Sequence, residues 1–216
     1  MRSELNKIDM KGRVVIGEGE MDEAPMLFIG EELGNKNGDE LDIAVDPLEG
    51  TNFTAKNLPG AISVLAITKK NGLLSAPDTY MEKIAIGKGF KKNIIDLDNT
   101  VEENIKLISE AKKLKPENLT ACVLKRSRHD NIISSLKSLN VKIKFIDDGD
   151  VTGVISVVDP SSNIDIYLGI GGGPEGVLAA AALHCLGGQM QTRLVLNNSD
   201  EINRAKSLGI KDYKKK

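Results

Sequence analysis

This sequence has few aromatic side chains and no large surplus of positive or negative charge. Its 216 residues include no Trp, and aromatic residues make up 3% of the chain. Surfaces that stack nucleic-acid bases need exposed aromatic rings, and surfaces that bind the phosphate backbone need an excess of Lys and Arg. The formal net charge of -2 provides no such excess. Both shortages disfavour nucleic acid and anionic membranes as partners.

Cysteine and long apolar runs are also scarce. The two cysteines, Cys122 and Cys185, form no paired metal or redox motif, so we expect two buried free thiols. No apolar stretch is long enough to span a membrane, and the first residues contain no apolar signal core. We therefore expect a cytoplasmic protein.

The residues that are present indicate a globular α/β protein, with 40% hydrophobic and 28% charged residues. Runs rich in Val, Ile and Leu alternate with patterns of helical period. Strands are predicted at 13–16, 41–45, 62–68, 83–86, 119–124, 141–146, 164–170 and 193–196. Helices are predicted at 23–33, 101–114, 129–139, 151–158, 175–186 and 200–208.

The rhythm of these elements changes along the chain. Before residue 119 the strands follow one another through loops and hairpins, whereas after it strands and helices alternate, which predicts parallel pairing. We expect a lobe boundary near Lys115-Pro116, with a first α/β lobe at 1–115 and a second at 116–216.

The segment DPLEGT at residues 46–51 is the most informative motif. An apolar strand ends there in two carboxylates, Asp46 and Glu49, which would repel each other unless a cation lay between them. Pro47 and Gly50 set the backbone of the turn, and Thr51 adds a hydroxyl. An ordinary β-turn accounts for Pro and Gly, but not for two acids at the end of an apolar run.

Two further segments place acids beside glycines. Residues 17–25, GEGEMDEAP, contain Glu18 and Asp22, although an acidic first turn of a helix would have the same composition. Residues 169–176, GIGGGPEG, join a predicted strand to a predicted helix and contain Glu175. Backbone N–H groups at such a helix start bind anions, and Glu175 could supply another oxygen to a metal. A flexible strand-to-helix turn is the simpler interpretation.

Basic residues supply the other half of a phosphate site. Arg126, Ser127 and Arg128 follow a strand and open a helix, where an anion would offset their unfavourable position at the helix start. The segment Asp148-Gly149-Asp150 ends the next strand, where it could cap a helix or bind sugar hydroxyls. His129 and His184 are expected to be structural.

The same glycines allow a rival interpretation. Gly171, Gly173 and Gly176 fit the dinucleotide-binding pattern G-x-G-x-x-G, with Asp200 downstream. Glu175 lies where the pyrophosphate would dock and would repel it unless a metal intervened, so a dinucleotide-binding oxidoreductase is the weaker alternative and would require nicotinamide-cofactor binding without metal.

Taken in order, the motifs VIGEGEMDEAPML, DIAVDPLEGT, APDTYMEK, RHD, DDGDV and GIGGGPEGVLAAAAL resemble those of the class II fructose-1,6-bisphosphatases. The resemblance runs from about Leu5 to Leu208. DPLEGT is shared by the wider superfamily of metal-dependent sugar and inositol phosphatases, whereas GEGEMDEAPM and GIGGGPEG are more specific to class II.

The resemblance implies a layered α/β sugar-phosphatase fold, an oligomer, and Mn²⁺- or Mg²⁺-dependent hydrolysis of the 1-phosphate of fructose 1,6-bisphosphate in gluconeogenesis and glycerol metabolism. It implies the metal ligands Glu18, Asp46, Glu49 and Glu175. It implies substrate contacts from Glu49, Gly50, Thr51, Tyr80, Arg126, Ser127, Arg128, Asp148, Gly149, Asp150 and Gly172. Asp22 matches an acid needed for activity, and Asp22 and Thr51 could orient the attacking water.

The chain also departs from this family. Family members begin with a helical segment that carries a metal-binding Asp and continue well beyond the equivalent of Lys216, and we expect both parts to be missing. Arg126 stands where Lys is usual, and Asn52 where Arg is common. Alternatives to an active enzyme of this class are therefore a catalytically incomplete fragment that binds sugar phosphate, and a related sedoheptulose-bisphosphate or inositol phosphatase.

Overall fold

The computed structural model describes residues 1–19 and 24–216, and these build two β-sheets. Sheet A has the strand order β2-β1-β3-β4, with β1 parallel to β3 and the other pairs antiparallel. Its strands are β1 (Lys11–Ile16), β2 (Glu32–Leu33), β3 (Glu40–Glu49) and β4 (Ile62–Lys69).

Sheet B has the order β7-β6-β8-β5-β9. Its strands are β5 (Tyr80–Ile86), β6 (Thr120–Leu124), β7 (Lys142–Ile146), β8 (Ile166–Gly172) and β9 (Gln189–Val195). The pairs β6–β7 and β6–β8 are parallel, as the alternation of strands and helices after residue 119 predicted, while β5 runs antiparallel to both of its neighbours.

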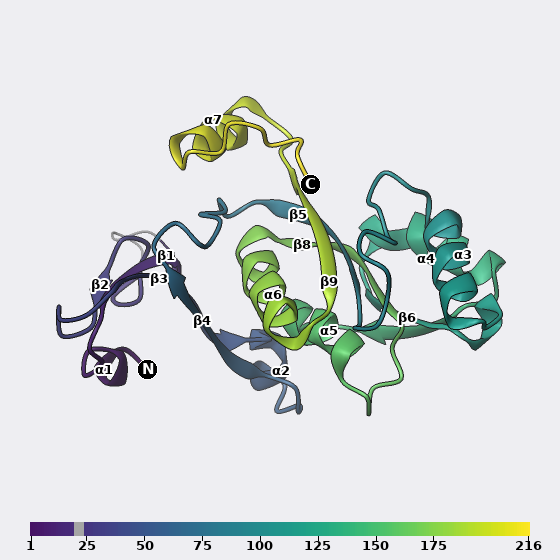
Figure 1. Cartoon of the computed structure of the whole chain (residues 1–216), viewed down its shortest axis with the longest axis horizontal. Coiled ribbons are helices and arrows are strands. Elements are labelled where there is room, and N and C mark those ends of the chain that lie inside the picture. The colour runs from purple at the N-terminus through teal and green to yellow at the C-terminus, as the bar shows by residue number, and fades with distance from the viewer. Residues whose placement is uncertain (20–23) are drawn as a thin grey trace.

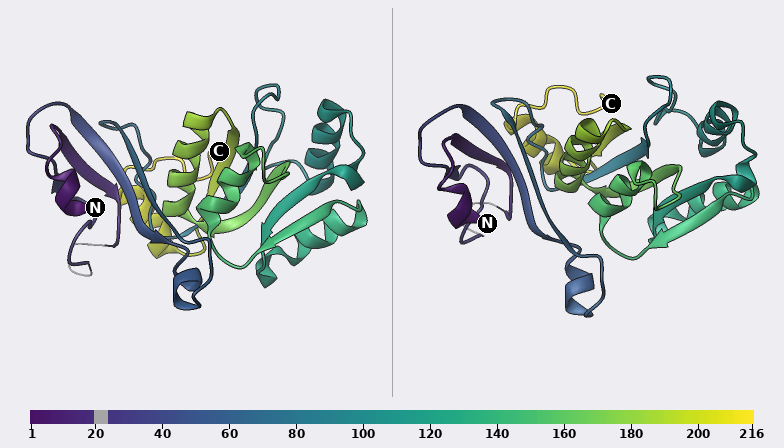
Figure 2. Two further views of the ribbon diagram at one scale, coloured as in Figure 1. Left: turned by 90° about the horizontal axis from the view of Figure 1, so that it is seen from below. Right: turned by 60° about the horizontal axis from the view of Figure 1, so that its bottom comes forward.

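Helices complete a layered arrangement (Figure 1). Helices α5 (Asp150–Ile155) and α6 (Gly173–Leu186) lie between the sheets, and α3 (Val101–Lys112) and α4 (Asp130–Ser138) cover the other face of sheet B (Figure 2). The remaining helices are α1 (Arg2–Leu5), α2 (Thr51–Ala55), α7 (Ser199–Ser207) and the short 3₁₀ turns η1 (Pro116–Asn118), η2 (Ser127–His129) and η3 (Ser156–Val158).

Three clusters of buried apolar residues hold the layers together. One joins sheet A to α5, α6 and sheet B, and includes Ala44, Val154 and Leu178. The second fills the space between sheet B and helices α3 and α4, and includes Ile105. The third lies on the outer face of sheet A. The layered α/β fold predicted from the sequence is therefore confirmed.

Each predicted strand overlaps an observed one, but the helix predicted at 23–33 is wrong over its described part. Leu27 and Gly30 have φ angles of 57° and 93°, which an α-helix cannot contain. The chain instead folds back along β1, and Glu31 is buried beneath it, where Arg2 donates to its carboxylate at 2.5 Å. Residues 32–33 form β2, which the sequence pattern did not predict.

Three predictions about single side chains are also corrected or confirmed. Cys122 is buried and free as expected, whereas Cys185, near the C-terminal end of α6, is exposed. His129 is buried and hydrogen-bonded to backbone, in agreement with a structural role.

The two sheets divide the chain between β4 and β5, within residues 70–79, and β5 lies inside sheet B. The boundary between the sheets therefore lies earlier in the chain than the lobe boundary expected near Lys115. The division into two lobes at that position stays a prediction. Within the described residues, no helix combines the length and the apolar character needed to cross a bilayer.

Candidate functional site

Three acidic segments that are distant in sequence lie near one another at the ends of β1, β3 and β8. Because β1 is parallel to β3, Glu18, which follows β1, lies at the same sheet edge as Asp46. A register shift between Asp46 and Glu49 marks a bulge at Pro47. Helix α6 packs against β3 and brings Glu175, in its first turn, to the same region. The four residues expected to bind metal therefore lie in one region of the structure, where neighbouring carboxylates act on one another.

Burial raises the pKa values of the carboxylates in this group, and for Glu18, Glu49 and Glu175 neighbouring carboxylates raise them further. Burial and then the charge of Asp46 raise the pKa of Glu18. Burial raises the pKa of Asp46, whereas a hydrogen bond from the Leu48 N–H and one with the Glu49 side chain lower it by less. Burial likewise raises the pKa of Glu175, with Asp46 and Asp150 contributing. Each carboxylate is thus more costly to ionise here than in water, which is typical of a functional cluster.

Glu49 is the most perturbed of the four. Its side chain is buried, and its Oε1 accepts a hydrogen bond of 2.9 Å from the backbone N–H of Val151 at the start of α5. Burial and the charges of Glu175, Asp46 and Asp150 raise the pKa of Glu49 to about 7, although the Val151 hydrogen bond opposes them. The ionised form is therefore held by one backbone donor, and no described Lys, Arg or His forms an ion pair with it.

Glu175 has a buried oxygen atom without a partner. Its Oε2 accepts no hydrogen bond from any described residue, and Gly172 provides the space it occupies, because a Cβ at that position would overlap the carboxylate. A buried carboxylate oxygen without a partner is costly unless a ligand satisfies it.

These observations give a mixed test of the expected metal site. Four carboxylates are an all-oxygen donor set, which suits Mg²⁺ or Mn²⁺, and the free oxygen of Glu175 needs a partner. Yet among residues 1–19 and 24–216 no three His, Cys, Asp or Glu side chains are grouped closely enough to hold one ion. The donor chemistry fits a divalent cation, and binding would require the side chains to turn toward it.

The basic half of the site lies beside Tyr80 at the start of β5. The guanidinium of Arg128 lies 4.8 Å from the centre of the Tyr80 ring, and its Nε donates to the carbonyl of Ile170 at 2.9 Å. Arg126 donates to the carbonyl of Asp147 at 2.8 Å. Tyr80 and Arg128 are exposed, so both can meet a ligand from solvent. Ser127 is exposed beside them.

His129 fixes the place of this basic segment. Its Nδ1 bonds to the carbonyl of Leu124 at 2.7 Å, and its Nε2 accepts from the N–H of Ile170 at 2.8 Å. These bonds tie the end of β6 to the end of β8, the strand that leads into Gly172.

The loop between β7 and α5 connects the two halves. The carboxylate of Asp148 accepts a hydrogen bond of 3.0 Å from the backbone N–H of Asn52 in α2. Gly149 has a φ of 78° and lies against the ring of Phe53. Gly149 is the N-cap and no side chain caps the helix, so the expected capping by this segment is wrong.

Asp150, another predicted substrate contact, already has partners for its carboxylate within the protein. Its carboxylate is buried and is bound by the ammonium of Lys83 and the hydroxyl of Tyr167. The sequence analysis missed both partners. The available signal was Lys83 itself, a charged residue between Met81 and Ala85 on the inward face of a buried strand.

The other predicted residues lie where the loops place them. Thr51 is exposed and opens α2 directly after Gly50, whose φ is 83°. Asp22 lies outside the described residues, so its position relative to the carboxylates stays a prediction. The dinucleotide interpretation is disfavoured, because Asp200 lies in the first turn of α7 and not at the end of a strand.

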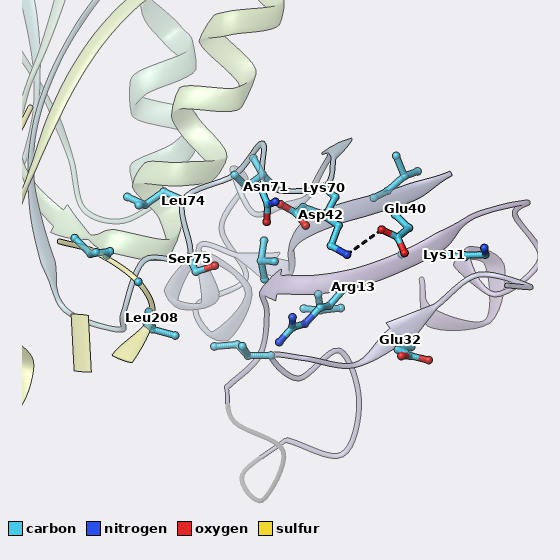
Figure 3. A pocket seen from close by; sticks show the side chains of 18 of the residues that line it. Lys11, Arg13, Glu32, Glu40, Asp42, Lys70, Asn71, Leu74, Ser75 and Leu208 are labelled. Carbon is cyan, nitrogen blue, oxygen red and sulfur yellow. Dashed lines mark hydrogen bonds and ion pairs between the residues drawn. The ribbon is translucent and has the colours of Figure 1, made fainter. Parts of the chain in front are cut away.

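A large cleft lies elsewhere, beside the C-terminal segment. It has a volume of about 1120 Å³ and is lined by β1, β3, residues 70–75 and residues 207–215 (Figure 3). Its polar groups have mixed charge, and the Lys70–Glu40 pair spans it at 2.8 Å. None of the four carboxylates lines it, so we place the functional site at the carboxylates despite the size of this cleft.

Comparison with known proteins identifies a family. A family model described as bacterial fructose-1,6-bisphosphatase, glpX-encoded, matches residues 1–216. A fructose-1,6-bisphosphatase class 2 from Haemophilus influenzae is 45% identical over 224 residues, covering 98% of this chain and 67% of that protein. A D-fructose 1,6-bisphosphatase class 2/sedoheptulose 1,7-bisphosphatase from Trichodesmium erythraeum is 43% identical over 236 residues, covering 98% and 68%.

The relative from Synechocystis, with the same double name, is 42% identical over 236 residues, with coverages of 98% and 68%. Among solved structures, an ancestral arginine-binding protein bound to glutamine gives a TM-score of 0.32 at 13% identity, covering 62% of this chain and 58% of that one, which is too weak to bear on the fold. The chain spans about two thirds of the length of its curated relatives and belongs to the bacterial class 2 fructose-1,6-bisphosphatase family.

Proposed function

We propose that this protein hydrolyses the 1-phosphate of D-fructose 1,6-bisphosphate to give fructose 6-phosphate and phosphate, as the names of its relatives suggest. One observation carries the proposal. Carboxylates from β3, from α6 and from the segment after β1 lie in one region with raised pKa values, and a basic segment with Tyr80 lies on the adjoining edge of sheet B.

The residues that would hold a divalent cation, Mn²⁺ or Mg²⁺, are Glu18, Asp46, Glu49 and Glu175. When bound there, a divalent cation offsets the charge of the phosphate and makes water a stronger nucleophile near neutral pH. The free Oε2 of Glu175 and the absence of an ion pair to Glu49 among the described residues support this assignment.

The chain's own groups would position the reacting phosphate. Glu49, Gly50 and Thr51 form the turn between β3 and α2, so the exposed hydroxyl of Thr51 can donate to a phosphate oxygen or orient the attacking water. Asp22 would share the task of orienting this water and accepting its proton. When the phosphate and the water are held side by side, the entropy cost of bringing them together is met on substrate binding, which lowers the barrier to the chemical step.

The rest of the substrate would lie toward sheet B. Arg126, Ser127 and Arg128 supply donors for the second phosphate, and Arg suits this task because its planar fork can bind phosphate through two N–H groups. Tyr80 lies under Arg128 and holds its guanidinium in place. Asp148, Gly149 and Gly172 border the space between the halves and would contact the sugar.

Phosphate release from fructose 1,6-bisphosphate by the purified chain, with and without Mn²⁺, tests this proposal. We expect release only with the cation. A folded chain that binds Mn²⁺ but releases no phosphate would instead be a catalytically incomplete fragment that binds sugar phosphate. A chain that shows neither Mn²⁺ binding nor release would refute the cation site.

The same assay separates the nearest alternative substrate. Two of the relatives carry the name sedoheptulose 1,7-bisphosphatase as well, so sedoheptulose 1,7-bisphosphate should be compared at equal concentration. An inositol monophosphate serves as a third substrate, and we expect it to be poor because it lacks the second phosphate that the arginines would bind.

We also propose a wider role for the protein. We place this protein in gluconeogenesis and glycerol metabolism, in the cytoplasm, as a homo-oligomer with a small sugar bisphosphate as its ligand. Size-exclusion chromatography with light scattering would test the oligomer, and a monomer at micromolar concentration would contradict it.

A further inference from the structure

Lys83 places a positive charge in the buried layer between sheet B and helices α5 and α6. It lies in the middle of β5, its side chain is on the same face as Met81 and Ala85, and it is 1% exposed. Helices α5 and α6 cover this face of sheet B. Burying an unpaired ammonium costs several kcal/mol, so a fold keeps one in its core only where it is paired.

The partner of Lys83 is Asp150, which lies beside the candidate carboxylate site. Its Nζ forms an ion pair with Asp150, which also accepts a hydrogen bond from the buried hydroxyl of Tyr167. Asp150 immediately precedes Val151, whose N–H holds Glu49 at 2.9 Å. A buried side chain in sheet B is therefore connected to a carboxylate of sheet A through one ion pair and one hydrogen bond.

Lys83 also acts on Glu175. Its charge favours the ionised form of that carboxylate, against burial and the negative charge of Asp150 and Asp46. Among the buried residues that the structure describes, Lys83 is the only Lys or Arg. Lys83 is therefore the internal counter-charge of Asp150, and its charge also reaches Glu175.

Two glycines of the GIGGGPEG segment make room for this arrangement. A Cβ at Gly171 would overlap the Asp150 carboxylate and lie 3.1 Å from Nζ of Lys83. A Cβ at Gly176 would lie 3.0 Å from Cε of Lys83 and would overlap the sulfur of Met81. Contacts this close are rare between real side chains. These glycines, which first suggested a dinucleotide, instead accommodate the Lys83–Asp150 pair.

We propose that Lys83 is a positioning residue: a fixed internal counter-charge that holds Asp150 and offsets the carboxylates of the site, so that they keep their places before a divalent cation binds. This inference rests on the proposed cation site. It assigns Lys83 no contact with the substrate, and its effect reaches Glu49 through Asp150 and Val151.

If Lys83 acts through its charge, removing that charge should change how strongly a cation stabilises the protein. If Lys83 only fills space, it should not. In Lys83→Met the apolar stem is kept and the charge is lost, so the carboxylates repel one another more strongly without a cation. In this variant a bound cation supplies the missing positive charge, and the Lys83 ammonium no longer repels the cation. We expect the rise in melting temperature caused by saturating Mn²⁺ to be at least about twofold larger than in the wild type.

Charge compensation provides the matched variant. Asp150→Asn removes one negative charge and should give a smaller Mn²⁺-induced rise than the wild type. Lys83→Met/Asp150→Asn removes both members of the pair and should return the rise to about the wild-type value. If Lys83→Met does not fold without the cation, Asp150→Asn decides alone: a rise equal to or larger than that of the wild type would overturn the inference.

Ile105→Ala serves as the control for lost stability, because Ile105 is fully buried in the cluster between sheet B and α3. It should lower the melting temperature but leave the Mn²⁺-induced rise unchanged. An equal rise in Lys83→Met and Ile105→Ala would show that Lys83 acts only through packing. If the wild type itself shows no rise and no cation-dependent phosphate release, the proposed function fails, which is a different outcome.

Discussion

Replacing Glu49 by Gln should stabilise the metal-free protein, because the structure holds this carboxylate in a place that disfavours its charge. Burial and three neighbouring carboxylates raise the pKa of Glu49 from an ordinary value of 4.5 to about 7. Gln has almost the same shape and can still accept the hydrogen bond from the Val151 N–H. The substitution therefore removes the charge and keeps the contact.

The size and the sign of the effect follow from this pKa. The folded state binds the proton more tightly than the unfolded state, so the wild type loses stability as the pH rises from about 4.5 to about 7 and then levels off. A tenfold change in proton affinity corresponds to about 1.4 kcal/mol, which makes the full loss about 3 kcal/mol as an upper limit. Glu49→Gln escapes this loss.

Urea denaturation with a chelator present, at several values between about pH 5 and pH 8, measures the effect. The free energy of unfolding of Glu49→Gln should exceed that of the wild type by up to about 3 kcal/mol at pH 8, and the difference should shrink toward pH 5. Glu40→Gln is the matched control, because Glu40 is exposed and a hydrogen bond from Lys70 lowers its pKa. A difference that does not change with pH would refute the reasoning. With Mn²⁺ present, the difference in the free energy of unfolding between Glu49→Gln and the wild type should become smaller or change sign, because only the wild type keeps the Glu49 carboxylate as a ligand for the cation.

Three further substitutions test other parts of the molecule. Asp46→Asn should abolish Mn²⁺-dependent phosphate release and leave the circular dichroism spectrum unchanged; unchanged turnover would remove Asp46 from the cation site. Arg128→Ala should raise KM for fructose 1,6-bisphosphate by about tenfold or more and leave hydrolysis of a small phosphate ester little affected, whereas equal effects would show that Arg128 does not hold the distal phosphate. Thr100→Ala breaks the capping box with Glu103 at the start of α3 and should cost about 1 kcal/mol in urea denaturation without changing KM; no loss of stability would contradict that cap.

The sequence points to the candidate carboxylates more directly than it does to the local fold around them. Asp46, Glu49 and Glu175 were identifiable because each stands beside glycine or proline at the end of an apolar run, and such patterns are local. The helix predicted at 23–33 failed because left-handed residues at Leu27 and Gly30 turn the chain back on β1. Apolar spacing alone does not reveal such a turn.

The Lys83–Asp150–Tyr167 cluster could not be predicted in the same way. Its three members come from β5, α5 and β8, and only the packing of α5 against sheet B brings them together. The strand pattern marks Lys83 as an inward-facing charge, but it does not identify the partner. Asp150 was expected to contact substrate, and the structure shows that its carboxylate is already bound by two buried groups.

The arrangement of the site suggests that cation binding and the packing of the layers are coupled. Glu49 belongs to sheet A, Glu175 to the helix layer, and Lys83 to sheet B, so the charges that must be balanced lie on three different layers. Besides the apolar cluster that joins these layers, the Val151–Glu49 and Asn52–Asp148 hydrogen bonds connect sheet A and α2 to α5 and the loop before it. Like charges on facing layers push the layers apart, and a cation shared by them pulls the layers together. The carboxylates would therefore weaken the contact between sheet A and α6 in metal-free protein and strengthen it when a cation is bound, which is why stability without metal is the informative measurement for Glu49 and Lys83.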